Sequence, residues 1–165
     1  MAKARAIEGL NADDPFAAAA AKIVAVRARE VADHSQDVLD MTDIERVHDM
    51  RVATRRLRAA LEIFEPCFPP PQHKEALREV KAVADALGGR RDADVTIAAL
   101  ERFAEGLAAP DRPGVASLVE KIRAEQAQAN AELESHVQSR RLAALSERLS
   151  ELVVEAETVV TEGRR

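Results

Sequence analysis

Hydrophobic residues recur at alternating spacings of three and four along most of the chain, which is the pattern of helices with one buried face. The pattern is clearest between residues 44 and 64, where Thr42 and Glu45 have the spacing of a capping box and Pro66 follows the last apolar residue. The face predicted to be buried consists of Val47, Met50, Thr54, Leu57, Leu61 and Phe64. This stretch is therefore predicted to form an amphipathic helix.

The residues on either side predict three further helices. One is expected from about residue 15 to 39, because Asp13-Asp14-Pro15 combines acidic caps with proline at the first helical position. After three consecutive prolines, a helix is expected over residues 71–87 and ends at Gly88-Gly89, since glycine readily terminates helices. A fourth helix then begins at Asp92 and runs to about residue 107.

The last third of the chain predicts two more helices after a loop at residues 108–114, which contains two prolines and a glycine. They cover about residues 115–136 and 140–160. The final helix carries an apolar face formed by Leu142, Leu145, Leu149, Leu152 and Val153. The whole pattern predicts an all-α, antiparallel bundle of about six helices.

Composition supports this fold class. Apolar residues make up 47% of the chain and charged residues 32%, but aromatic residues only 2%. Alanine, leucine, glutamate and arginine favour helices, whereas the aromatic and β-branched residues of strands are scarce. At 165 residues, one domain is expected. We predict a flexible N-terminus at residues 1–12, followed by one helical domain at 13–165.

The net charge of −5 argues against a general nucleic-acid binder. Residues 44–91, however, contain ten Lys/Arg and seven Asp/Glu residues, a local charge of +3 that leaves −8 for the remainder. A basic surface on an acidic protein suits a compact anion. With Cys67 as the only cysteine, no apolar leader and no apolar run of ~18 residues, we expect a cytoplasmic protein that does not enter membranes.

The second predicted helix carries a row of basic side chains. His48, Arg51, Arg55 and Arg58 fall within a sector about 80° wide, and the row is about 15 Å long. Such cations repel one another unless an anion neutralises them. Arginine suits phosphate because its planar guanidinium donates paired hydrogen bonds to two oxygens. The alternative is an ordinary solvated face.

The third predicted helix repeats this theme with Lys74, Arg78 and Lys81 at i, i+4 and i+7. Glu75 and Glu79 are available to neutralise them as surface ion pairs of little energetic value. By itself, this second row is better explained as a solvated surface.

An antiparallel arrangement of these two helices would place the rows on either side of one groove. It is expected to bring Lys81, together with Arg90 and Arg91, to the end of the bundle that holds His48 and Arg51. Because free N–H groups at a helix start favour anions, the predicted start at Arg90-Arg91-Asp92 adds to this site. Asp92 is expected to cap that helix or to orient Arg91.

No catalytic constellation or metal-ligand motif is evident. His34, His73 and His136 are scattered and are expected to be solvated or to cap helices, and Cys67 is expected to be a small packed residue. A metal site at His48-Asp49 would need ligands from elsewhere. We therefore expect no enzyme activity and no cofactor.

Two segments resemble the motifs of a known family. Residues 47–61 (VHDMRVATRRLRAAL) closely resemble the signature helix of the CHAD family, the conserved-histidine α-helical domain. Residues 87–95 (LGGRRDADV) resemble the second motif of that family, a Leu-Gly turn followed by Arg-Asp and then an Asp-Val pair. The resemblance extends over about residues 15–160.

The resemblance implies a helical bundle whose basic face binds inorganic polyphosphate, often at polyphosphate granules. Carried over by position, the binding residues are His48, Arg51, Arg55 and Arg58, with Lys81 and Arg91. Arg90, Arg56, Lys74 and Arg78 match more loosely, and Arg56 points to another side of its helix.

The resemblance also implies a full domain about twice as long, with two similar halves. Only the first half is recognisable here, so the chain is expected to form half of a double bundle and to pair as a homodimer. The alternative is a fragment with an exposed apolar edge and weakened binding; pairing is favoured because a lone bundle is expected to leave the apolar face of the last helix uncovered. Two other functions are compatible with the residues. One is a scaffolding helical protein that binds an acidic partner, and the other is a metal-dependent phosphohydrolase at His48-Asp49.

Overall fold

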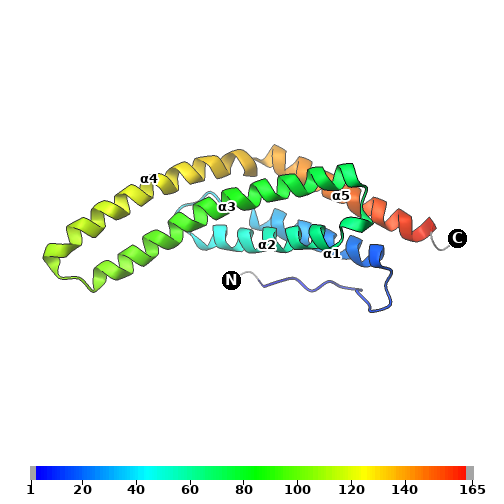
Figure 1. The fold of residues 1–165 in the computed structure, drawn as a ribbon, viewed down its shortest axis with the longest axis horizontal. Coiled ribbons are helices and arrows are strands. Elements are labelled where there is room, and N and C mark those ends of the chain that lie inside the picture. The colour runs from blue at the N-terminus through cyan, green and yellow to red at the C-terminus, as the bar shows by residue number, and fades with distance from the viewer. Residues whose placement is uncertain (1–2, 163–165) are drawn as a thin grey trace.

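The computed structural model describes residues 3–162, which form five α-helices and no strand (Figure 1). The helices are α1 (Phe16–His34), α2 (Glu45–Ile63), α3 (Pro70–Glu105), α4 (Arg112–Val137) and α5 (Ser139–Glu162), with short 3-10 turns at Glu65–Cys67 and Ala109–Asp111. The predicted all-α bundle is confirmed. The predicted number of about six helices is wrong, because the expected third and fourth helices are one.

The helix α3 runs through Gly88-Gly89 without a break. Its buried positions continue at spacings of three and four across the two glycines, and they are Val80, Val83, Leu87, Arg90, Asp94 and Ile97. Two of these six residues, Arg90 and Asp94, are charged, so the apolar pattern is interrupted after Leu87 although the buried face continues. Tertiary packing of this face outweighs the low helix propensity of glycine. The predicted helix start at Asp92 is therefore wrong.

Two other predicted helix ends are corrected. The first helix ends at His34 instead of Leu39, because Asp37 adopts a left-handed conformation (φ 53°) that interrupts the helix. Thr42 does not cap the second helix: its Oγ1 donates to Asp40 Oδ1 at 2.7 Å. The helix α2 starts at Glu45, whose backbone N–H donates to Asp43 Oδ1 at 3.2 Å.

The helices pack in sequence around one core. Helix α1 lies between α2 and α5, α2 packs against α3, and α3 packs against α4. The predicted apolar face of α2 is buried throughout, and on α5 Leu145, Leu149 and Leu152 are buried against the α1 side of the bundle. The expectation that a lone bundle would leave the α5 face uncovered does not hold for these residues.

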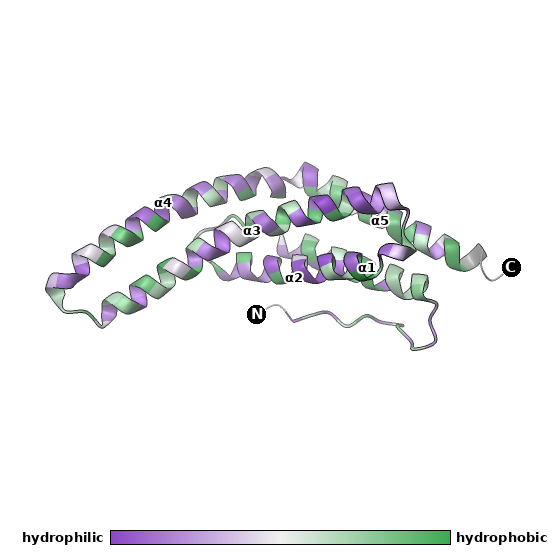
Figure 2. Cartoon of the chain, viewed as in Figure 1, coloured by the Kyte–Doolittle hydropathy of each residue, from purple (hydrophilic) through white to green (hydrophobic). Residues whose placement is uncertain are grey.

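Apolar and polar residues alternate along every helix (Figure 2). Among the helices that the structure describes, none combines the length and the continuous apolarity that a membrane crossing requires.

The second half of α3 and the first half of α4 extend beyond the other helices as a two-helix arm (Figure 1). The buried seam there consists of Ile97 and Val119 together with Arg90, Ala93 and Asp94, whereas Phe103 is 61% exposed. Two helices can cover only one stripe of each other, so apolar side chains on the outer faces of the arm remain in water.

Residues 3–14 lie along α1 and are attached through a buried carboxylate. Glu30 on α1 is 2% exposed, accepts the Arg5 backbone N–H at 2.6 Å and pairs with Arg27 at 2.7 Å. Burial alone would raise the pKa of Glu30, but these hydrogen bonds and the charges of Arg27 and Arg56 outweigh it and hold the pKa below its usual value. The division into a flexible segment at 1–12 and a domain at 13–165 stays a prediction, and residues 1–2 and 163–165 lie outside the described part.

Candidate functional site

Helices α2 and α3 run antiparallel, as the sequence predicts. Near the start of α2, the Arg91 guanidinium donates to the Ile44 carbonyl oxygen at 3.2 Å. Near the end of α2, Lys81 lies 3.4 Å from the Glu62 carboxylate. These contacts correct one detail: Arg91 lies at the His48 end of α2, but Lys81 lies at the opposite end.

A groove of about 400 Å³ follows the contact between these two helices. Its α2 wall is formed by Arg51, Arg55 and Arg58. Its α3 wall is formed by Ala84, Asp85, Gly88, Gly89 and Asp92. The structure thus brings three of the four residues of the predicted basic row into one cavity.

The charges of this groove are unevenly satisfied. Arg58 pairs with Glu62 at 3.0 Å, and its hydrogen bond to that carboxylate is the main reason why the pKa of Glu62 is lowered. The side chains of Arg51 and Arg55, by contrast, make no hydrogen bond or ion pair with any residue that the structure describes, although Asp85 and Asp92 line the same groove. Positive charge in the middle of the groove is therefore available to an external anion.

The other predicted site residues of α2 and of the first turns of α3 lie outside the groove. His48 is half-buried one turn before Arg51 and does not line the cavity. Arg56 lies toward Glu30 on the α1 side, as its charge effect on that carboxyl indicates. Lys74 and Arg78 are exposed on the first turns of α3 and do not line the groove either. Glu75 and Glu79 do not neutralise them, because both carboxylates lie 2.7 Å from Arg148 on α5.

Arg90 is completely buried, so the prediction that it faces a ligand does not fit the structure. Its Nε donates to Asp94 Oδ1 at 2.9 Å, and its Nη1 donates to the side-chain oxygen of Asn130 on α4. Gln126 donates to the same Asp94 oxygen at 2.6 Å, and Asn130 also donates to the Leu39 carbonyl oxygen. Arg90 therefore joins α3 to α4 and to the loop after α1. Asp92, expected to cap a helix, is an exposed mid-helix residue of the groove wall.

His73 has one of the two roles expected from the sequence, that of a helix cap. It is 3% exposed, and its Nε2 donates to the Leu61 carbonyl oxygen at 2.8 Å while its ring stacks on Phe68. It is therefore not solvated but caps α2, because Leu61 lies in the last turn of that helix, where carbonyl oxygens lack intrahelical partners. The same bond connects the start of α3 to α2. Cys67 is partly buried, as expected for a packed residue, and burial raises the pKa of its thiol.

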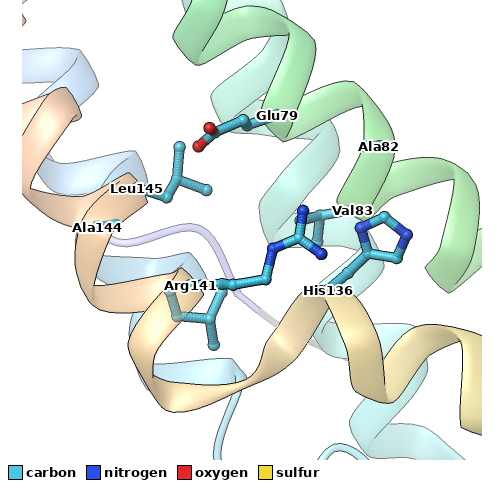
Figure 3. A pocket seen from close by; sticks show the side chains of 8 residues that line it. Glu79, Ala82, Val83, His136, Arg141, Ala144 and Leu145 are labelled. Atoms are coloured by element: carbon cyan, nitrogen blue, oxygen red, sulfur yellow. The ribbon is translucent and has the colours of Figure 1, made fainter.

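A second hollow, of about 250 Å³, lies where α3 meets the junction of α4 and α5 (Figure 3). His136 and Arg141 lie on one side of it and Glu79 on the other, with Val83 and Leu145 between them. The Arg141 guanidinium is occupied with the Ser135 carbonyl oxygen at 2.7 Å. This hollow lacks the free cations of the groove.

The α3 wall of the groove was missed by the sequence analysis. Asp85, Gly88, Gly89 and Asp92 are spaced i, i+3, i+4 and i+7, which places them on one face of a continuous helix. The signal was therefore present, but the prediction of a turn at the glycines concealed it.

The described residues contain no group of three or more His, Cys, Asp or Glu side chains that could hold a metal ion. By its fold and its groove, the protein is a helical bundle with an arginine-lined groove between two antiparallel helices.

Residues 22–164 match the CHAD domain family, and the chain belongs to this family. The family is linked generally to polyphosphate-associated proteins and is typically non-catalytic, and no catalytic family is detected in the chain. Comparisons with curated proteins and with solved structures found no match.

Proposed function

We propose that the protein binds inorganic polyphosphate, without cleaving it, in the groove between α2 and α3. In this proposal, Arg51, Arg55 and Arg58 contact phosphate oxygens in the groove. His48 and Arg91 extend the basic surface at one end, and Lys81 extends it at the other. Arg90 is left out because it is buried.

The observation that carries the proposal is the pair of unneutralised arginines, Arg51 and Arg55, in a cavity lined by three guanidinium groups. Each guanidinium keeps its charge at neutral pH and donates several hydrogen bonds in one plane. A chain of phosphates presents negatively charged oxygens at regular intervals, so one ligand can satisfy several arginines at once. The family's link to polyphosphate-associated proteins supports the same ligand.

Location at polyphosphate granules and pairing with a second copy belong to the same proposal. A homodimer would provide a second groove and would supply the half that the full family domain is expected to contain. The apolar side chains left exposed on α5, Val154 and Val159, are available for such a contact.

The test is a titration with long-chain inorganic polyphosphate, followed by calorimetry and light scattering, of the wild type and of Arg51→Ala/Arg55→Ala. We expect the double variant to lose about 3 kcal/mol of binding free energy, since hydrogen bonds to charged groups contribute about 1.5–3 kcal/mol each. Binding by the wild type is expected to weaken steeply with salt, and orthophosphate is expected to bind far more weakly.

The matched control is Arg123→Ala/Arg140→Ala, which removes the same charge from exposed positions outside the groove. It should bind polyphosphate like the wild type. Equal losses in both double variants would mean that net charge alone attracts the ligand. A wild type that binds no polyphosphate at physiological salt would instead favour an acidic protein partner, and phosphate release dependent on a divalent metal and on His48 would favour a phosphohydrolase.

A further inference from the structure

Gly88 and Gly89 lie in the middle of the 36-residue helix α3. Glycine loses more backbone freedom on folding than other residues, so it weakens a helix interior. Two reasons usually justify it there. One is a positive φ, but among the glycines that the structure describes only Gly9 has one.

The other usual reason is the close approach of a neighbouring element, and this is also absent. A Cβ placed on Gly88 or Gly89 would meet no atom within 4 Å outside the helix's own backbone. The folded chain therefore has room for side chains at both positions. The space above them is the groove, whose other wall carries Arg51, Arg55 and Arg58.

We propose that Gly88 and Gly89 determine which ligand the groove accepts, by leaving the α3 wall without side chains opposite the arginines. This inference rests on the proposed function and deepens it. Asp85 and Asp92 stand one turn before and after the glycine pair on the same wall. A polyanion is repelled at both carboxylates and can approach α3 closely only between them.

The geometry selects a thin, unbranched polyanion. A chain of phosphates without sugars or other bulky substituents can lie between the guanidinium groups and the glycine backbone. Side chains at 88 and 89 would fill that space and hold the phosphates away from the arginines, which weakens charge-assisted hydrogen bonds because these require short donor–acceptor distances.

The inference predicts effects of opposite sign on folding and on binding. Gly88→Ala/Gly89→Ala should raise the thermal midpoint by about 2–4 °C per substitution, because alanine favours the helix. The same variant should bind long-chain inorganic polyphosphate about tenfold more weakly, which corresponds to about 1.4 kcal/mol. Gly88→Leu should weaken polyphosphate binding more than the alanine variant does, since leucine has a helix propensity similar to that of alanine but a larger volume.

Gly114→Ala is the matched control, because Gly114 is also helical with open space around it but lies at the start of α4. It should raise the midpoint and leave polyphosphate affinity unchanged. Unchanged affinity in the glycine-pair variant would overturn the inference. Equal losses for alanine and leucine would also overturn it, since they would indicate a need for a flexible helix instead of space. If the wild type itself binds no polyphosphate, the proposed function fails and the inference fails with it.

Discussion

Arginines in two neighbouring regions of this molecule have opposite environments. At the junction of α3 and α4, Arg90 is fully buried and bonded to Asp94 and Asn130. In the groove, whose other wall is the neighbouring part of α3, the side chains of Arg51 and Arg55 on α2 have no partner among the described residues. All three arginines lie in the two segments that resemble motifs of the family, residues 47–61 and 87–95. Residue type alone therefore does not separate the buried arginine from the two in the groove.

The difference teaches that the partners of a guanidinium decide its role. A buried arginine must have its charge compensated within the fold, because desolvation is otherwise too costly. An arginine at the rim of a groove can remain solvated and keep its donors for a ligand. The junction is therefore expected to control stability and the groove to control binding, and each of the following changes tests one side of that division.

Arg90→Ala should have the largest effect on folding. Removing one member of a buried ion pair leaves Asp94 uncompensated, which typically costs about 3–5 kcal/mol of unfolding free energy. Chemical denaturation would measure it, with Arg123→Ala as control, because Arg123 and its partner Glu101 are each about half exposed and such pairs contribute about 0–1 kcal/mol. A loss below 1 kcal/mol for Arg90→Ala would contradict a structural role.

Glu30→Gln should destabilise the chain by about 2 kcal/mol at neutral pH, since the buried charge compensates Arg27. The pKa of Glu30 is lowered in the folded state from its usual 4.5, so the unfolded chain takes up the proton first on acidification. The contribution is therefore complete above pH 4.5 and is lost as the pH falls through the folded pKa. Urea denaturation between pH 3 and 7 should show that the unfolding free energy falls less on acidification in the variant than in the wild type. An equal fall in both proteins would disprove this role of Glu30.

Asp85→Asn/Asp92→Asn should have the smallest effect and should act on binding alone. Removing two carboxylates from the α3 wall reduces repulsion of a polyanion, which should tighten polyphosphate binding by a few tenths to about 1 kcal/mol at low salt. Because both side chains are exposed, stability should change by less than about 0.5 kcal/mol. Titration in the presence of a chelator would measure it. Weaker binding would instead mean that these carboxylates hold part of the ligand complex.

Most helices were predictable because their buried faces are apolar. The periodicity of α2 predicted a stripe that is buried at every position, including Thr54. The continuity of α3 was not predictable from the same signal, because Arg90 and Asp94 occupy core positions and only their partners on α4 explain why. For His73 the sequence left open whether it is solvated or capping, since its hydrogen bond goes to a backbone carbonyl that no sequence pattern marks.

The groove was predicted in part. The spacing of Arg51, Arg55 and Arg58 predicted that they share one face of their helix, and the antiparallel contact of α2 and α3 followed from their short connection. The position of Lys81 depended on which helix ends meet, and the acidic and glycine positions of the opposite wall depended on α3 being continuous. Both are properties of the packed bundle.

The two-helix arm also affects how the protein behaves in solution. A compact chain of 165 residues would have a radius of gyration of about 15 Å, whereas α3 alone, with its 36 residues, is about 54 Å long. A single copy should therefore diffuse slowly and elute early from a sizing column, like a larger compact protein. Its mass in solution, and with it the proposed pairing of two copies, should be taken from light scattering or sedimentation equilibrium, which do not depend on shape.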